Sequence, residues 1–459
     1  MNLPHYVRSL LMRLARAGVP AYVVGGAVRD TLLGRRPADY DVAAGAPVER
    51  LRAVFSGYKT TETGARFGTL GVLVQGHLVE VTAFRRDGVY LDSRRPEEVL
   101  FTDDLAEDLA RRDFTINAMA LDADGALVDP FGGAADLEAG IVRAVGDPDE
   151  RFAEDALRIL RGARFCAQLG FSMDEKTKAA AFRRAPSLAG ISAERVRDEL
   201  LKLLTGDDAA NALLAYDEII FCAIPELRAC KNFDQHNPNH HLDVWGHIVL
   251  TVRRVDKKPV LRVAALLHDV AKPRCFTMEG ERGRFWGHME ASAADARVIL
   301  ERLRFPAKFT DTVCALVEYH DKPYQATPVD ARRWLSKLGA ENTYLVIRLK
   351  YADCLAHDKS YHRHLPRLRA FKAQVDAALR RRDCYTLSGL AVSGRDVNRA
   401  LGIAPSERTG ALLRALLDAV IEGICDNRKD DLLELAAQLN RMPELPVPGD
   451  GLPDGRPRV

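Results

Sequence analysis

The stretch that most constrains the fold of this 459-residue chain is Val23–Val42, which reads VVGGAVRDTLLGRRPADYDV. An apolar run ends in Gly25 and Gly26, a helix-like segment follows, and Asp39 and Asp41 then occupy alternate positions. On a β-strand, alternate residues share a face and lie about 7 Å apart, so the two carboxylates can share a pair of divalent cations. A glycine turn followed by a solvated acidic loop is the other interpretation, and the joint pattern favours the cation site.

The glycines and the basic residue of the same stretch predict a phosphate-binding turn. Gly25 and Gly26 let backbone N–H groups approach phosphate oxygens, the following helix offers its positive end, and Arg29 adds a charge. We therefore expect this part of the chain to present a triphosphate to cations held by the acidic pair.

Two further strands are predicted in the first third of the chain. The runs Gly71–Val74 and Leu78–Phe84 are short, apolar and separated by a turn, so residues 1–145 are expected to form a small mixed α/β domain. Glu80 lies in the second run. It would be a third catalytic carboxylate if its strand pairs with the strand of the acidic pair. The alternative is that Glu80 is a non-catalytic residue on a solvated face of its strand.

The segment RRDFTINA at 111–118 places two arginines just before an apolar, helix-like run. Arginine at a helix start is unfavourably placed in the helix dipole, which indicates an anionic partner. We expect Arg112 to contact the triphosphate, with a surface salt bridge as the alternative. A helix cap is the structural role open to Asp113.

Beyond about Asp149, helical periodicity replaces the strand pattern. The stretch Glu154–Leu169 is predicted to be one amphipathic helix. Charged residues recur in it at every third position and form a row along the helix, namely Asp155, Arg158, Arg161 and Arg164. An aspartate that accepts from an exocyclic amine, beside an arginine that donates to a ring nitrogen, would fit cytosine and adenine and mispair with guanine and uracil. Asp155 and Arg158 suit this task, although charged helix faces are often merely solvated.

The remaining composition restricts the cellular setting more than the chemistry. A net charge of +2, from 66 basic and 64 acidic residues, does not by itself indicate a nucleic-acid partner, so any basic surface must be local. The eight cysteines are dispersed, which predicts a reducing cytoplasm. No segment has the apolar length of a signal peptide or a membrane span, so no membrane partner is expected.

Five motifs occur in the order found in bacterial class II tRNA nucleotidyltransferases, the CCA-adding enzymes of the polymerase β superfamily. They are the Gly25–Asp41 stretch, RRDFTINA, DPFGG, EDALRILRGARF and ISAERVRDEL, and they span about residues 20–205. The chain resembles that family rather than the related poly(A) polymerases, whose RRF-x-L-x-H run and extended basic tail it lacks.

The resemblance implies a template-independent enzyme that adds CCA to the 3′ end of tRNA from CTP and ATP. It implies two Mg²⁺ ions on Asp39 and Asp41, with Gly26, Arg29 and Arg112 near the triphosphate. The helix that carries Asp155 and the three arginines of its row would select the base, and further helical domains would grip the tRNA.

The histidine-rich middle of the chain resembles the HD-domain metal phosphohydrolases. In those proteins a histidine, an adjacent His-Asp pair and a distant aspartate bind a divalent metal, and further histidines serve a second metal or the phosphate. The corresponding residues are His247, His268, Asp269 and Asp353, with His288 and His320 as accessory residues. Imidazole and carboxylate ligands suit a transition metal or Mg²⁺. Members of the nucleotidyltransferase family differ in whether this domain is active, so hydrolysis stays open.

The predicted fold class is α+β, with a mixed α/β nucleotidyltransferase head followed by an all-helical remainder. We expect a head at 1–145, a neck at 146–206, an HD-type body at 207–330, a helical tail at 331–440 and a disordered C-terminus at 441–459. The oligomeric state is not predicted.

Three alternatives stay open at this point. One is an enzyme of the same fold that adds only CC or only A. Another is an HD phosphohydrolase that uses the head to recognise RNA ends. The third is a non-catalytic RNA-binding protein, which the metal-spaced carboxylates disfavour.

Overall fold

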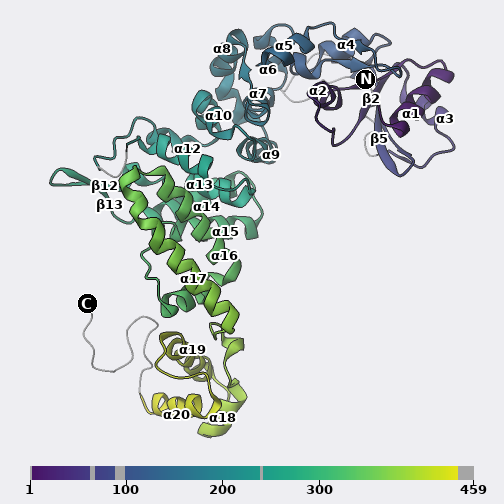
Figure 1. Cartoon of the computed structure of the whole chain (residues 1–459). Coiled ribbons are helices and arrows are strands. Elements are labelled where there is room, and N and C mark those ends of the chain that lie inside the picture. The colour runs from purple at the N-terminus through teal and green to yellow at the C-terminus, as the bar shows by residue number, and fades with distance from the viewer. Residues whose placement is uncertain (1–2, 63–67, 88–98, 238–240, 443–459) are drawn as a thin grey trace. The chain divides into compact units, whose positions relative to one another are not determined.

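The computed structural model of the chain describes residues 3–62, 68–87, 99–237 and 241–442 (Figure 1). The chain divides into two compact units. The first comprises Met1–Lys231, Lys257–Val263 and Val298–Pro306, and the second comprises Asn232–Asp256, Ala264–Arg297 and Ala307–Val459. From residue 443 onward, the predicted disordered C-terminus lies outside the described residues.

A seven-stranded mixed sheet forms the centre of the head, in the strand order β3-β4-β5-β2-β1-β8-β9. Its strands are β1 Ala21–Val24, β2 Asp41–Ala44, β3 Thr60–Thr61, β4 Thr69–Val74, β5 His77–Ala83, β8 Ala120–Leu121 and β9 Leu127–Val128. Within this sheet β2 and β5 pair in parallel, and the other pairs are antiparallel. A separate pair joins β6 Arg85–Asp87 to β7 Val99–Phe101.

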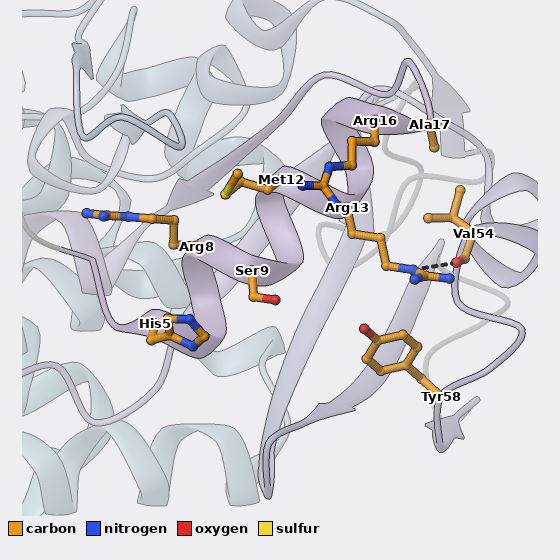
Figure 2. Close-up of a pocket in the computed structure, with 9 residues that line it drawn as sticks. All are labelled: His5, Arg8, Ser9, Met12, Arg13, Arg16, Ala17, Val54 and Tyr58. Atoms are coloured by element: carbon orange, nitrogen blue, oxygen red, sulfur yellow. Dashed lines mark hydrogen bonds between the residues drawn. The ribbon is translucent and has the colours of Figure 1, made fainter.

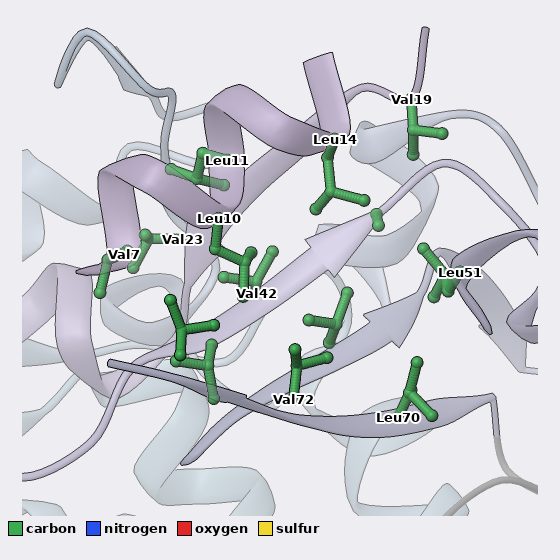
Figure 3. Packing of buried hydrophobic residues seen from close by; sticks show 14 of the residues in the cluster. Val7, Leu10, Leu11, Leu14, Val19, Val23, Val42, Leu51, Leu70 and Val72 are labelled. Atoms are coloured by element: carbon green, nitrogen blue, oxygen red, sulfur yellow. The ribbon is translucent and has the colours of Figure 1, made fainter. Parts of the chain in front are cut away.

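Helix α1, His5–Arg16, covers one face of this sheet (Figure 3). Its apolar residues recur at the spacing of one helix face and are buried, namely Val7, Leu10, Leu11 and Leu14. They pack with Val23, Val42 and Val72 of three strands. Each fully buried leucine contributes roughly 1.5–3 kcal/mol. Because side chains alternate along a strand, the residues next to these valines face the opposite side.

The opposite face has its own smaller core, which includes Val24, Ala43, Phe84 and Ala120. The remaining helices of the head and of the segment that follows it are α2 Gly26–Leu32, α3 Val48–Val54, α4 Leu105–Ala110, α5 Gly133–Ala139, α6 Pro148–Glu154, α7 Leu157–Leu169, α8 Glu175–Arg184, α9 Ala193–Leu204, α10 Ala209–Ala215 and α11 Asp217–Ala223. A short parallel pair, β10 Ile141–Val142 and β11 Ser172–Met173, lies among them.

The prediction of one helix over Glu154–Leu169 is wrong at its start. Helix α6 ends at Glu154, Asp155 has extended backbone angles (φ −145°, ψ 102°), and α7 begins at Leu157. The Asp155 carboxylate accepts a hydrogen bond from the backbone N–H of Leu157 at 3.0 Å, which helps to start the new helix.

The second unit is largely helical, as predicted. Its helices are α12 Val244–Arg254, α13 Pro259–Leu267, α14 His288–Arg302, α15 Ala307–Tyr319, α16 Pro328–Ala356, α17 Leu365–Arg381, α18 Gly394–Leu401, α19 Glu407–Glu422 and α20 Lys429–Asn440, of which α13 and α14 also extend into the first unit. A hairpin of β12 Phe276–Glu279 and β13 Arg282–Phe285 interrupts the predicted helical run. No described helix is long and apolar enough to cross a lipid bilayer.

Candidate functional sites in the head and in the second unit

Asp41 and Glu80 lie on the face of the sheet opposite α1, and Asp39 is near enough to act on the charge of Asp41. Strand β2 begins at Asp41, so Asp39 lies two residues before the strand, and the prediction that both aspartates share one strand is wrong for Asp39. The parallel register places Asp41 beside Glu80, which meets the condition under which the sequence analysis considered Glu80 as a third carboxylate. Val42 and Val81 belong to the core under α1, so Asp41 and Glu80 point the other way. Each of the three residues has solvent-exposed surface, although neighbouring groups partly desolvate the Asp41 carboxylate.

The environment of Asp41 disfavours its negative charge. Desolvation, followed by repulsion from Asp39 and Glu80, raises the pKa of Asp41 to about 6, and Arg112 acts in the opposite direction. A bound cation would relieve this repulsion. In the described part of the chain, the groups of three potential ligands whose ligand atoms all lie within 4.8 Å of one another are in the second unit, so the head carboxylates are not drawn together as closely.

The glycine turn brings Arg112 over the backbone beside the carboxylates. Gly25 has a left-handed φ of 72°, and a Cβ at this position would lie 3.1 Å from Nη1 of Arg112. Arg112 also forms an ion pair with Asp108 at 3.2 Å. Helix α2 starts at Gly26, and Arg29 on this helix donates to Oδ1 of Asn117 at 2.8 Å and to Asp30. The structure therefore gathers Gly25, Arg29 and Arg112 at one site.

The charged row of the predicted selection helix is tied into intramolecular ion pairs. Asp155 pairs with Arg195 of α9 at 2.7 Å and not with Arg158. Arg158 pairs with Glu154 at 2.5 Å and donates to the carbonyl oxygen of Arg111 at 3.0 Å. The predicted base-reading couple is thus not preassembled as a mutual pair.

The two later arginines of the row have partners of their own. Arg161 pairs with Asp113 at 2.5 Å, and Arg164 pairs with Glu199 at 3.1 Å. Arg164 is only 7% exposed, and its guanidinium carbon lies 3.9 Å from the ring centre of Phe165. Desolvation and the charge of Arg161 lower the pKa of Arg164 to about 10, although Glu199 opposes the shift. Sequence reasoning gave Asp113 only the role of a helix cap and did not single out Glu199, because pairs across elements leave no local spacing signal.

Five elements of the second unit converge on one buried cluster of histidines and aspartates. Nε2 of His247 on α12 lies 2.9 Å from Asp353 on α16 and 3.3 Å from Nε2 of His268. Oδ2 of Asp269 lies 3.1 Å from His268. The accessory histidines approach Oδ1 of Asp269 with their Nε2 atoms, at 3.7 Å for His288 and 3.4 Å for His320. The structure thus brings together all six residues predicted for this site.

Backbone carbonyl groups orient three of these imidazoles. Nδ1 of His268 lies 2.8 Å from the carbonyl oxygen of Ala265. Nδ1 of His288 lies 2.8 Å from the carbonyl oxygen of Phe285, and Nδ1 of His320 lies 2.6 Å from that of Val317. With Nδ1 donating, the lone pair of Nε2 points into the cluster, as in metal-ligating histidines. The oxygens of Asp269 are buried without a hydrogen bond of regular geometry. This donor set fits a divalent metal.

Lysines and one further histidine complete the surroundings of the cluster. Lys272 lies 2.7 Å from Asp269, and Nδ1 of His357 lies 3.8 Å from Asp353. Sequence reasoning missed His357, although its position four residues after Asp353 on α16 places it on the same helix face. Lys350 donates to the carbonyl oxygens of His320 at 2.7 Å and Lys322 at 3.0 Å, so it holds the turn that follows α15.

The anionic aspartates control protonation in the cluster. Burial opposes the charge on His268, but Asp269 and Asp353 outweigh it and raise the pKa of His268 to about 10. Burial lowers the pKa of His247 to about 4, against the effect of Asp353. A bound cation would replace the proton on His268, because metal ligation requires neutral imidazole.

Family models match three separate parts of the chain. Residues 21–143 match the Poly A polymerase head domain, residues 170–229 match a probable RNA and SrmB-binding site of polymerase A, and residues 239–358 match the HD domain. The fold and the head site therefore define a nucleotidyltransferase with a polymerase-type head, whose reaction depends on metal ions, joined to an HD domain.

Comparison over the whole length is more specific. The chain is 35% identical to the CCA-adding enzyme of Geobacillus kaustophilus over 95% of its own length and 97% of the relative. It is 34% identical to the CCA-adding enzyme of Leuconostoc citreum over 94% of its own length and 95% of that relative. This chain belongs to the CCA-adding enzymes, the tRNA nucleotidyltransferases.

Solved structures agree with this assignment. The Bacillus stearothermophilus CCA-adding enzyme in complex with CTP superposes with a TM-score of 0.71 at 30% identity, covering 96% of this chain and 98% of that one. The Thermotoga maritima CCA-adding enzyme complexed with tRNA shares the fold, with a TM-score of 0.58 at 20% identity and coverage of 94% of each chain.

Proposed function

We propose that this chain completes the 3′ end of tRNA with CCA by using CTP and ATP, and that Asp39 and Asp41 are its catalytic metal ligands. The observation that carries the proposal is the gathering of both carboxylates, the Gly25 turn and Arg112 at one edge of the head, in a chain that aligns with CCA-adding enzymes along nearly its whole length. The division into head, neck, body and tail is part of the same proposal.

In the proposed reaction the 3′-hydroxyl of tRNA loses its proton to solvent and its oxygen forms a bond to the α-phosphorus. The bond between the α-phosphorus and the bridging oxygen breaks, and pyrophosphate leaves. Mg²⁺ held by Asp39 and Asp41, with Glu80 beside them, would supply Lewis-acid activation of the hydroxyl and neutralise phosphate charge. The Gly25–Gly26 turn admits the triphosphate close to the backbone, and Arg29 and Arg112 bind its oxygens.

Base selection is proposed for the row that begins at Asp155. Nucleotide binding would exchange the ion pairs of Asp155 with Arg195 and of Arg158 with Glu154 for hydrogen bonds to the Watson–Crick edge of cytosine or adenine. Arg161 and Arg164 extend the same row. Because both stay tied to carboxylates of neighbouring elements, we assign them to the support of the selecting pair as well as to nucleotide binding.

Replacing a proposed metal ligand tests the reaction. Asp41→Ala should abolish incorporation of both CTP and ATP, while binding of tRNA persists, because the carboxylate holds the cation and not the RNA. Incubating the parent protein with tRNA that ends before CC, and with tRNA that ends after CC, separates full CCA addition from CC-only or A-only addition. Incorporation that survives Asp41→Ala would refute the metal assignment.

Replacing Asp155 tests base selection. Asp155→Ala should reduce discrimination against UTP and GTP by roughly 10- to 100-fold, with a smaller effect on triphosphate binding, because a mispaired buried group is what excludes the wrong base. Glu150→Ala, which removes an exposed carboxylate of α6, is the matched control and should leave discrimination unchanged. Equal discrimination in the two variants would count against the pairing argument.

The HD cluster supports a second candidate activity, the hydrolysis of phosphate esters with Mg²⁺ or a divalent transition metal. The specific observation is the set of three imidazoles fixed by backbone carbonyls around the buried oxygens of Asp269, which form no hydrogen bond of regular geometry. We place the protein in a reducing compartment, the cytoplasm, in accord with its eight free cysteines.

A further inference from the structure

A basic groove lies on the outer side of α1, away from the head site described above (Figure 2). It has a volume of about 450 Å³ and lies between α1 and the end of α3. Three arginines and one histidine line it, and no carboxylate does. Helix α1 also precedes the part of the chain that matches the polymerase head model, which begins at residue 21.

Within the described part of the head, no carboxylate forms an ion pair with the three arginines of this groove. The first acidic residue of the chain is Asp30, so α1 carries no carboxylate of its own. Arg8 and Arg16 are exposed, and their side chains form no ion pair or hydrogen bond with the described residues. Arg13 instead donates to the carbonyl oxygen of Val54 at 2.8 Å, and its guanidinium carbon lies 4.9 Å from the ring centre of Tyr58.

The sheet separates the groove from the proposed metal ligands. The inner face of α1 is buried against the valines of the sheet (Figure 3), and Asp41 points to the opposite face. The apolar face of α1 is therefore already occupied. An amphipathic helix needs that face to insert into a lipid surface, so a membrane is not the partner that this helix fits.

We infer that the groove binds the phosphodiester backbone of an RNA strand. Arg8 and Arg16 lie eight residues apart, about 12 Å along the helix axis, so their charges are spread along a line rather than converging on one phosphate. A linear polyanion matches such a row, and RNA backbones are bound mainly by such cations.

The other lining groups suit a nucleotide strand as well. The guanidinium of Arg13 is stacked over Tyr58, which offers a flat cationic surface on which a base can lie. Met12 is 46% exposed next to it and offers an apolar contact. The inference rests on the proposed function in one respect, which is that RNA is taken as the polyanion. Its test is separate from that function, since the test measures binding and not nucleotide addition.

The test measures tRNA binding in an Asp41→Ala background, so that addition cannot alter the RNA. With full-length protein and a tRNA transcript that lacks CCA, the Arg8→Ala/Arg16→Ala variant should bind roughly 25- to 60-fold more weakly at 0.1 M salt. Its plot of log affinity against log salt should be less steep by about 1.4–1.8, because two phosphate contacts are lost. Arg8→Lys/Arg16→Lys keeps the charges and should bind nearly as the parent does.

Arg52→Ala/Arg302→Ala is the matched control, because it removes the same charge from exposed arginines that already pair with Glu62 and Glu226. It should leave the tRNA affinity and the salt slope nearly unchanged, and thermal unfolding of all variants should match the parent.

Unchanged tRNA affinity in the Arg8→Ala/Arg16→Ala variant would overturn the inference. So would weaker binding of CTP or ATP without weaker binding of tRNA, which would make the groove a nucleotide site. If the groove variant loses tRNA affinity but wild-type protein adds no nucleotide, the proposed function fails and this inference stands.

Discussion

At the scale of single residues, Asp113 connects α7 to the head. It is buried, accepts hydrogen bonds from Asn117 at 3.0 Å and from Arg161, and Asn117 in turn accepts from Arg29. Burial opposes its charge, but Arg161 and Asn117 outweigh this and lower the pKa of Asp113 to about 2. The sequence indicated only a helix cap for Asp113. The 3₁₀ turn at Thr115–Asn117 has no side-chain cap, so that expectation is wrong.

The depressed pKa predicts a loss of stability at low pH. Since the folded pKa lies below the unfolded value of about 3.9, the contribution of Asp113 is fully present above that value and is lost as the pH falls towards 2. At pH 6, Asp113→Asn should lower the protection of the α7 amides against hydrogen exchange by about 2 kcal/mol. The difference should shrink to about 0.4 kcal/mol at pH 2 and vanish at lower pH, and an undiminished difference at pH 2 would contradict the assignment.

At the scale of elements, α5 can approach the turn at Thr115–Asn117 only because of Gly133. A Cβ at this position would lie 2.2 Å from the carbonyl oxygen of Thr115, which is backbone and cannot move aside. The contact is reinforced by a hydrogen bond from Oγ1 of Thr115 to Asp136 of α5 at 2.6 Å. This close approach gives a physical reason for the second glycine of the DPFGG motif.

Gly133→Ala should therefore destabilise the first unit by about 2–3 kcal/mol, because overpacking against backbone forces the helix away. Gly410→Ala is the control. Gly410 lies within α19 with open space where its Cβ would be, so alanine there should stabilise the second unit by about 0.5–1 kcal/mol. Differential scanning calorimetry, with hydrogen exchange to assign each transition, measures both effects. Equal shifts of the same sign would show that the close contact does not matter.

At the scale of the whole molecule, the two candidate sites belong to different compact units. The head carboxylates lie in the first unit, and the six residues of the HD cluster lie in the second. The sites share no ligand.

Variants at the two sites should therefore behave independently. His268→Ala should abolish metal-dependent phosphate release from a phosphate monoester and leave CTP incorporation within about twofold of the parent, because the head ligands are intact. Asp41→Ala should do the reverse. Loss of both activities in either variant, with folding unchanged, would contradict this independence.

The sequence predicted much of the fold because its signals are local. The glycine turn, the strand periodicity and the amphipathic pattern that runs to Leu169 each specify an element from neighbouring residues, and α7 ends at Leu169 in the structure. The hairpin at Phe276–Phe285 was missed, because its exposed, charged strands lack an apolar alternation. The break at Asp155 was missed because the apolar pattern continues across it.

By itself the sequence determined the residue types, their order and their spacing, and these indicated a two-metal nucleotidyltransferase head, a base-selecting row and an HD metal site. Only the tertiary structure decided which charges meet. It placed Asp41 beside Glu80, and it paired Asp155 with Arg195 and Arg161 with Asp113. In the HD cluster it brought His247 into contact with Asp353, although the two residues are 106 positions apart in the sequence. Such pairings depend on the packing of distant elements, and local periodicity carries no record of them.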